Sequence, residues 1–340
     1  MKRLAFLAIL LSQAATAQEA EPVTPASIAE AAAPEEWVAI PPEDLLVMDL
    51  APDAAGRARQ VIIQLMPAPF SQPWVQNIRT LARAHWWDGT SVYRVVDNWV
   101  AQWGAGEDAD AGFVPRPLPE GVVSPVAAYE AMLASVPPQT EQYEALSALV
   151  NEQLANAEPG TGFITNQIDG FPTEQSTFWD SFADFVTFDQ GWPIGNMYDP
   201  RGFAWPVHCY AHVGVARDLA PDTGTGAELY AVIGHAPRQL DRNIAVVGRA
   251  ISGIEHLSTL PRGTGEAGVY ETRAEDAPIV SVRLGDELPE QPRFEYLATT
   301  SDSFARYVES RANRDDAFYT VPAGGVDVCN VQVPVRPAAL

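Results

Sequence analysis

The chain has 340 residues, of which 47% are apolar and 19% are charged, a composition typical of a globular protein with a sizeable core. Its 44 acidic and 21 basic side chains give a formal charge of −23, which argues against binding to nucleic acid or to anionic membrane surfaces. Lys2 is the only lysine, so removal of the extreme N-terminus leaves none for a Schiff base or a phosphate-binding loop.

The first 17 residues have the pattern of a signal peptide. Met1-Lys2-Arg3 is a short basic start, Leu4–Leu11 is an apolar run, and Ala15-Thr16-Ala17 offers the small residues after which signal peptidase cleaves. The run is too short to span a bilayer, and no later stretch approaches the roughly 18 apolar residues that a span needs. We therefore expect residues 1–17 to be removed and the mature protein to be periplasmic or secreted, without a membrane anchor.

Residues 18–43 are rich in Ala, Glu and Pro, which predicts a flexible tether between the signal peptide and the folded domain. Order is expected to begin near residue 44. Two β-branched, apolar runs follow, and the turn residues between them predict a hairpin of strands over Leu45–Leu50 and Gln60–Met66.

A helix is predicted to begin after Ser71, because Pro73 suits a first helical turn and the next apolar residues recur at helical spacing. Two short strands are expected next, over Ser91–Val96 and Trp99–Trp103.

Residues 105–205 differ in character from the segments on either side. Pro and Gly are frequent, and helical patterns stand out at 125–135 and 141–157. An aromatic-rich passage at 177–192 would not stay in solvent. We interpret the segment as a partly helical insertion that packs on the main domain.

Strand signals return after residue 207, and the chain ends in an extended, Pro-containing tail. The strands are expected at His212–Val215, Glu228–Ile233, Ile244–Ala250 and Ile279–Leu284, with helices at Ile251–Leu260 and Ser301–Arg311. Many short strands and two principal amphipathic helices favour a mainly β fold, a barrel with capping helices, over a βαβ fold. The domain would span 44–340, interrupted by 105–205.

Two cysteines, Cys209 and Cys329, are too few for a disulfide scaffold. An exported location allows them to pair, and two free buried thiols are the alternative. The neighbouring pair His208 and His212 suggests a metal site only if the segment is helical. It has the pattern of an extended segment instead, with no second Cys/His pair nearby in sequence, so we expect no metal.

Three blocks of the sequence carry motifs in a fixed order. The first, at 60–104, contains Val92-Tyr93-Arg94-Val95 and Gln102-Trp103-Gly104, and the second, at 212–237, contains Gly226-Ala227-Glu228-Leu229-Tyr230-Ala231. The third, at 239–261, has a Leu-Asp turn, a strand and a helix. In this order the blocks resemble those of the cyclophilin-type peptidyl-prolyl isomerases. That family has Phe-His-Arg-Val and Gln-Gly-Gly in the first block, Gly-Ser-Gln-Phe-Phe-Ile in the second, and a Leu-Asp-Gly turn, a Val-Phe-Gly strand and its second helix in the third.

The resemblance implies a closed eight-stranded barrel capped by two helices. It also implies catalysis of cis/trans isomerisation at X–Pro bonds in proline-containing polypeptides, with no metal, nucleotide or redox cofactor. The insertion and the C-terminal segment resemble those of larger exported bacterial members, so the expected substrates are exported proteins.

The same resemblance assigns site residues. Arg94 takes the catalytic donor position, and Gln102 holds Arg94 and the peptide backbone. The positions that contact the peptide or line the proline pocket are Trp99, Val100, Ala216, Arg217, Glu228, Tyr230 and Leu240. On pattern alone, Arg94 would be a surface residue of a half-buried strand, and the apolar members would be ordinary core residues.

Several positions depart from the family pattern. Glu228 stands where the family has Gln, and its carboxylate would either pair with Arg94 or repel acidic substrates. Arg217 stands in place of an Asn, and Ile244 in place of the His that closes the pocket. These changes favour an alternative function, a proline-peptide binding or chaperone module with weak catalysis.

Overall fold

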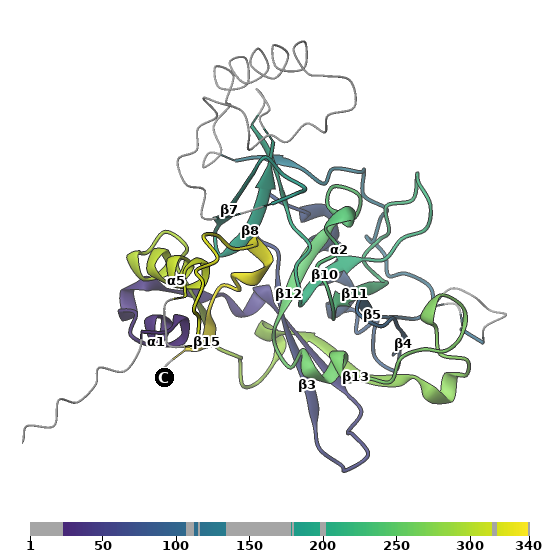
Figure 1. Cartoon of the computed structure of the whole chain (residues 1–340). Coiled ribbons are helices and arrows are strands. Elements are labelled where there is room, and N and C mark those ends of the chain that lie inside the picture. Colours follow the sequence, from purple (N-terminus) through teal and green to yellow (C-terminus); the bar gives the residue numbers. More distant parts are fainter. Residues whose placement is uncertain are drawn as a thin grey trace, which may run out of the picture.

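Eight antiparallel strands close into a barrel in the order β10-β11-β5-β4-β13-β2-β3-β12 (Figure 1). The computed structural model describes residues 23–106, 112–114, 116–133, 178, 180–197, 202–314 and 318–338. The barrel strands are β2 (Leu45–Leu50), β3 (Arg59–Leu65), β4 (Ser91–Val95), β5 (Val100–Gly104), β10 (His212–Val215), β11 (Leu229–Val232), β12 (Val246–Ser252) and β13 (Ala277–Leu284). The predicted barrel is confirmed.

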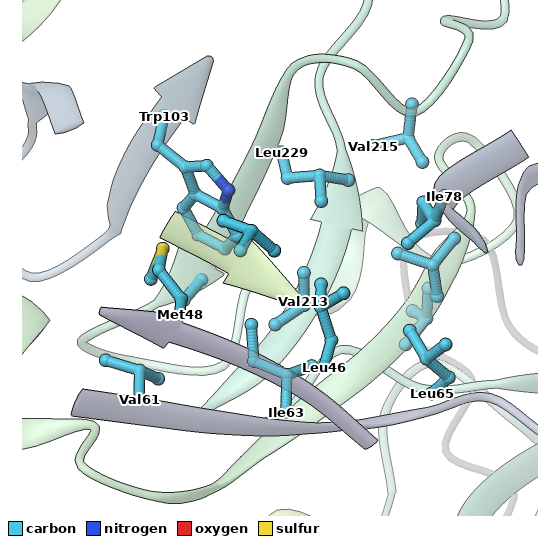
Figure 2. Close-up of a cluster of buried hydrophobic side chains, with 14 of the residues drawn as sticks. Leu46, Met48, Val61, Ile63, Leu65, Ile78, Trp103, Val213, Val215 and Leu229 are labelled. Atoms are coloured by element: carbon cyan, nitrogen blue, oxygen red, sulfur yellow. The ribbon is translucent and has the colours of Figure 1, made fainter. Parts of the chain in front are cut away.

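Alternation along the strands fills the barrel interior. Successive side chains of a strand point to opposite faces, so every second residue of a strand points into the core, and these residues are apolar. Figure 2 shows this for β3, where Val61, Ile63 and Leu65 face the same interior as Leu46 and Met48 of β2.

Helix α2 (Gln72–Arg83) covers one side of this core. Its apolar stripe, with Trp74, Ile78 and Leu81 fully buried, confirms the predicted helix. Ser71 occupies the N-cap position in a left-handed conformation, and its side chain makes no capping bond there.

The helix predicted over 251–260 is shorter than expected. Strand β12 continues to Ser252, and α4 (Glu255–Ser258) is a single turn that buries Leu257. Gly253, which has a left-handed backbone conformation, separates the two elements. Only glycine fits at this position, because a Cβ would lie 1.9 Å from the carbonyl oxygen of Gln60. Among the described residues, no helix is long and apolar enough to cross a bilayer.

The expectation of a flexible tether at 18–43 is wrong over residues 23–43. Helix α1 (Pro25–Glu30) begins at a Thr24 capping box, and β1 (Trp37–Ile40) follows. The Ala- and Pro-rich composition concealed the apolar residues Ile28 and Ile40, which are both buried. Residues 1–22, with the predicted signal peptide, lie outside the described part of the chain.

These N-terminal elements belong to a second layer outside the barrel. Strand β1 pairs with β14 (Phe294–Leu297), which pairs with β15 (Val335–Pro337). Helix α5 (Asp302–Ala312) confirms the helix predicted at Ser301–Arg311, and the hydroxyl of its N-cap Ser301 accepts the Phe304 N–H. Helices α1 and α5 pack against each other beside this sheet (Figure 1).

The described part of the insertion contains a four-stranded β-sheet. Its strands are β6 (Ala131–Met132), β7 (Phe185–Asp189), β8 (Trp192–Asn196) and β9 (Phe203–Pro206), in the order β6-β9-β8-β7. The helix predicted at 125–135 is absent from residues 125–133. Side chains of the main domain hold the backbone there instead, since Asn77 donates to the Val123 carbonyl and Thr223 to the Pro125 carbonyl. The predicted helix at 141–157 lies outside the described residues.

A disulfide joins Cys209 to Cys329 and ties the C-terminal segment to the loop before β10. Of the two alternatives, paired cysteines or buried thiols, the structure has the pair. Cys209 is buried, and the apolar residues packed around the bridge include Trp205, Val207 and Val328.

Replacing both cysteines by serine should lower the free energy of unfolding by about 4 kcal/mol, because the bridge restricts an unfolded loop of more than a hundred residues. Urea unfolding of the double variant measures this loss. The wild-type protein under a reducing agent is the matched control, and it should be destabilised to the same extent. A double variant as stable as the oxidised protein would contradict the prediction.

Candidate active site

A cavity of about 820 Å³ opens on the outer side of β4, β5 and β11. All nine residues predicted for the site line it, although they come from four separate segments of the chain. They are Arg94, Trp99, Val100, Gln102, Ala216, Arg217, Glu228, Tyr230 and Leu240. Ile244, one of the departures from the family pattern, lines it as well.

Strand alternation separates this cavity from the barrel core. On β5, Ala101 and Trp103 enter the core, while Val100 and Gln102 face the cavity. On β11, Leu229 enters the core and Tyr230 faces outward.

The outward apolar residues form a cluster of their own, distinct from the barrel core. Val100, Tyr230 and Val232 are buried in it, and the partly buried side chains packed on them are Val96, Trp99, Ala216, Leu240 and Ile244. The result is an apolar pocket outside the barrel, with one wall on two adjacent strands.

A β-bulge brings Arg94 to this pocket. Val92 pairs with Trp103 and Arg94 pairs with Gln102, so Tyr93 is an extra residue on β4. Regular alternation would put the neighbours Tyr93 and Arg94 on opposite faces. With the bulge, Val92 and Val95 enter the core, and both residues between them reach Gln102.

The guanidinium of Arg94 is held at two of its nitrogens. Nη1 donates to Oε1 of Gln102 at 2.9 Å, and Nε donates to the carbonyl oxygen of Ala267 at 2.7 Å. The ring of Trp99 lies below it, 5.1 Å from the guanidinium carbon to the ring centroid. Burial lowers the pKa of Arg94, but a guanidinium stays protonated in proteins near neutral pH.

The amide of Gln102 is oriented in turn by a chain of hydrogen bonds. Nε2 of Gln102 donates to the Tyr93 hydroxyl at 2.5 Å, and that hydroxyl donates to Oε2 of Glu228 at 2.8 Å. Because an ionised carboxylate only accepts hydrogen bonds, Tyr93 must donate to it. The Gln102 oxygen is thereby left for Arg94.

The Glu228 carboxylate is engaged by groups other than Arg94. Its Oε1 accepts the backbone N–H groups of Ala105 and Gly106 at 2.8 and 3.0 Å. Among the described residues Arg94 forms no ion pair, so the predicted alternative of a Glu228–Arg94 pair is not found. The space for the carboxylate comes from Gly104, where a Cβ would lie 2.1 Å from Oε2.

Arg217 lines the cavity, but its guanidinium points to the neighbouring loop. Nε and Nη2 donate to the Asn243 carbonyl at 3.2 and 3.1 Å, and Nη1 donates to the Asp218 carbonyl at 2.7 Å. The side chain thus joins the two loops that carry Ala216 and Ile244.

Sequence reasoning missed two residues that hold the site together. The position of Tyr93 beside Arg94 was a local signal. The β-bulge that directs Tyr93 towards Gln102, however, cannot be predicted from the sequence pattern. Ala267 had none, because it contributes a backbone carbonyl from a tight turn in which its own φ is +52°.

Comparisons with known proteins agree with the three blocks found in the sequence. Residues 60–284 match the sequence profile described as cyclophilin type peptidyl-prolyl cis-trans isomerase/CLD. The crystal structure of the cyclophilin AquaCyp293 from Hirschia baltica is 20% identical, with 88% of this chain and 92% of that chain covered and a TM-score of 0.57.

A second solved structure is a cyclophilin-type peptidyl-prolyl cis-trans isomerase from Cryptosporidium parvum in the presence of the dipeptide Ala-Pro. It is 8% identical over 70% of this chain and 98% of that chain, with a TM-score of 0.34. A search of curated proteins finds no match.

Proposed function

Because this chain belongs to the cyclophilin-type peptidyl-prolyl cis-trans isomerases, we propose that it accelerates rotation about X–Pro bonds of exported polypeptides with Arg94 as the catalytic donor. The proline ring would occupy the apolar cluster of Val100, Tyr230 and Leu240, and Arg94 would stand at the rim of that cluster.

The chemistry needs no bond to be made or broken. Rotation of a peptide bond has a barrier of about 18–20 kcal/mol because resonance stiffens the C–N bond. At an X–Pro bond both isomers are populated, but unaided exchange takes roughly tens to hundreds of seconds. A catalyst must bind the twisted amide more tightly than either planar isomer.

One observation carries the proposal. Arg94 is held at Nε and Nη1, while Nη2 has no hydrogen-bond partner among the described residues. A twisted amide has a lone pair on the proline nitrogen that the planar amide lacks. A fixed cationic donor at the rim of an apolar pocket stabilises that nitrogen selectively, without reorganising during the reaction.

The export of the protein and of its substrates rests on two supporting features. The signal-peptide pattern at 1–17 is one, and the Cys209–Cys329 disulfide, a bond that persists in oxidising compartments, is the other. Expression with secretion, followed by intact-mass measurement, tests this. A mature chain beginning at Gln18 supports export, and an unprocessed chain in the cytoplasm contradicts it.

Exchange spectroscopy on a short Ala-Pro peptide tests the activity without a coupled enzyme. Addition of the protein should produce cis/trans exchange cross-peaks on a timescale at which the free peptide shows none. Peptide resonances that shift without faster exchange would contradict the proposal. That outcome would favour the binding module, for which the replacement of the family's His by Ile244 is the supporting observation.

A further inference from the structure

A row of buried polar groups leads away from the floor of the apolar pocket. The hydroxyl of Tyr230 lies 3.0 Å from Nε2 of His208, and Nδ1 of His208 lies 2.9 Å from Oδ1 of Asp241. Asp241 also accepts the backbone N–H of His208 at 2.8 Å. Since the carboxylate can only accept, Nδ1 of His208 donates to Asp241, and Nε2 is left to hydrogen-bond the Tyr230 hydroxyl.

The row continues into the insertion. Nε of Arg238 donates to Oδ2 of Asp241 at 2.6 Å, and the same guanidinium forms an ion pair with Asp180, with 3.2 Å from Nη2 to Oδ1. Asp180 is fixed by the backbone N–H groups of Phe182 and Ala183, both at 2.8 Å. The chain of contacts thus joins residues 180–183 of the insertion to Tyr230 in the pocket.

All of these groups are shielded from water. The exposed fraction of the side chain is 0% for His208, 5% for Asp241, 4% for Arg238 and 3% for Asp180. Burial raises the pKa of Asp241, but the hydrogen bond from His208 and the charge of Arg238 outweigh it and hold the pKa below its ordinary value. Separating the charged members of such a buried network would leave a buried charge without its partner, which is energetically costly. The network therefore holds these side chains in fixed positions.

Tyr230 has a hydroxyl where an apolar ring would suffice to contact proline. That hydroxyl turns away from the pocket, towards His208, and the glycine at 214 makes room for it. A Cβ at Gly214 would lie 2.3 Å from the Tyr230 hydroxyl oxygen. The ring is therefore anchored at its far end, while its face lines the pocket beside Val100 and Leu240.

We propose that Asp180 and Arg238 are positioning residues, which fix the floor of the apolar pocket through Asp241, His208 and the hydroxyl of Tyr230. The insertion would thus set the affinity of the pocket for a proline ring. This inference rests on the proposed function, in that the pocket is taken to receive proline.

A double-mutant cycle tests whether Asp180 acts on the pocket through the Tyr230 hydroxyl. Asp180→Ala should raise the KM for an Ala-Pro peptide about threefold or more, with the exchange rate at saturation within about twofold of wild type, because Arg94 is not disturbed. Tyr230→Phe should raise KM similarly by releasing the same anchor. The double variant should match the single variants. Effects that multiply, or an unchanged KM in Asp180→Ala, would overturn the inference.

The insertion also provides a matched control. Glu130 forms an ion pair with Arg242, which directly follows Asp241, but this pair does not lead to Tyr230. Glu130→Ala should leave KM at the wild-type value, and a KM raised as much as in Asp180→Ala would overturn the inference. If Asp180→Ala does not fold, Asp180→Asn keeps the shape and removes the charge, and the same criteria apply to it.

A readout independent of catalysis separates this inference from the proposed function. The ring ¹⁵N shifts of His208 should change in Asp180→Ala and stay unchanged in Glu130→Ala. A wild-type protein that neither binds the peptide nor accelerates its exchange would contradict the proposed function, whereas the His208 shifts would still test the chain of contacts. Unchanged His208 shifts in a folded Asp180→Ala protein would overturn the inference whatever the activity.

Discussion

An Arg94→Ala protein is expected to lose its acceleration of X–Pro exchange by about 100- to 1,000-fold, the loss typical for removal of one preorganised donor to a transition state. Its fold should survive, since Arg94 is half-buried on the outer face of β4 and the barrel core does not include it. Exchange spectroscopy on an Ala-Pro peptide measures the rate, and thermal unfolding reports the fold.

Two further variants make this result specific. Arg262→Ala removes another arginine, which pairs with Asp97 outside the cavity, and should keep the wild-type exchange rate. Arg94→Lys keeps the charge but loses the fork that bonds both Gln102 and Ala267, so it should recover only a small part of the rate. An Arg94→Ala protein with wild-type turnover would refute the assignment.

Glu228→Ala is expected to reduce both stability and activity. The change leaves two backbone N–H groups and the Tyr93 hydroxyl without this buried acceptor, and we expect a loss of about 3 kcal/mol in the free energy of unfolding. With Tyr93 released, the Gln102 amide is free to turn away from Arg94. Misplacement of the donor should then lower the exchange rate about tenfold or more. Urea unfolding and exchange spectroscopy measure the two effects.

Glu228→Gln separates the two effects. The amide oxygen still accepts the backbone N–H groups of Ala105 and Gly106, so stability should return to within about 1 kcal/mol of wild type. Its NH₂ group donates to Tyr93, however, and this reverses the direction of the chain that orients Gln102. Activity should therefore lie between wild type and Glu228→Ala. A Glu228→Ala protein as stable and active as wild type would refute this role for the carboxylate.

The sequence was sufficient to predict the barrel and the set of residues around the cavity. Val61, Ile63 and Leu65 alternate along the chain with residues that point away from the core. This period of two can be read from the sequence because one face of each strand must be buried. The ordered family motifs then placed Arg94, Gln102 and Tyr230 on strands that prove to be neighbours, with Glu228 directly before β11.

What the sequence did not predict depends on contacts distant along the chain. Helix α1 is short and Ala-rich, and it forms where Ile28 can pack against α5, some 270 residues later. The backbone at 123–125 is held extended by Asn77 and Thr223, which local helical spacing cannot reveal. Such elements are specified by tertiary partners rather than by propensity.

The connections within the site were equally hidden. A carboxylate near a catalytic arginine suggests an ion pair, and only the bulge at Tyr93 and the missing side chain at Gly104 turn Glu228 to other partners. His208 had the pattern of half a metal pair, but the fold places it between Asp241 and Tyr230. Neither outcome follows from spacing along the chain.

The location of the bound proline tests the central claim most directly. A nuclear Overhauser spectrum of the protein with an Ala-Pro peptide should show contacts from the proline ring protons to the methyl groups of Val100 and Leu240, beside Arg94. Contacts confined to another surface, with none to these methyl groups, would contradict the account.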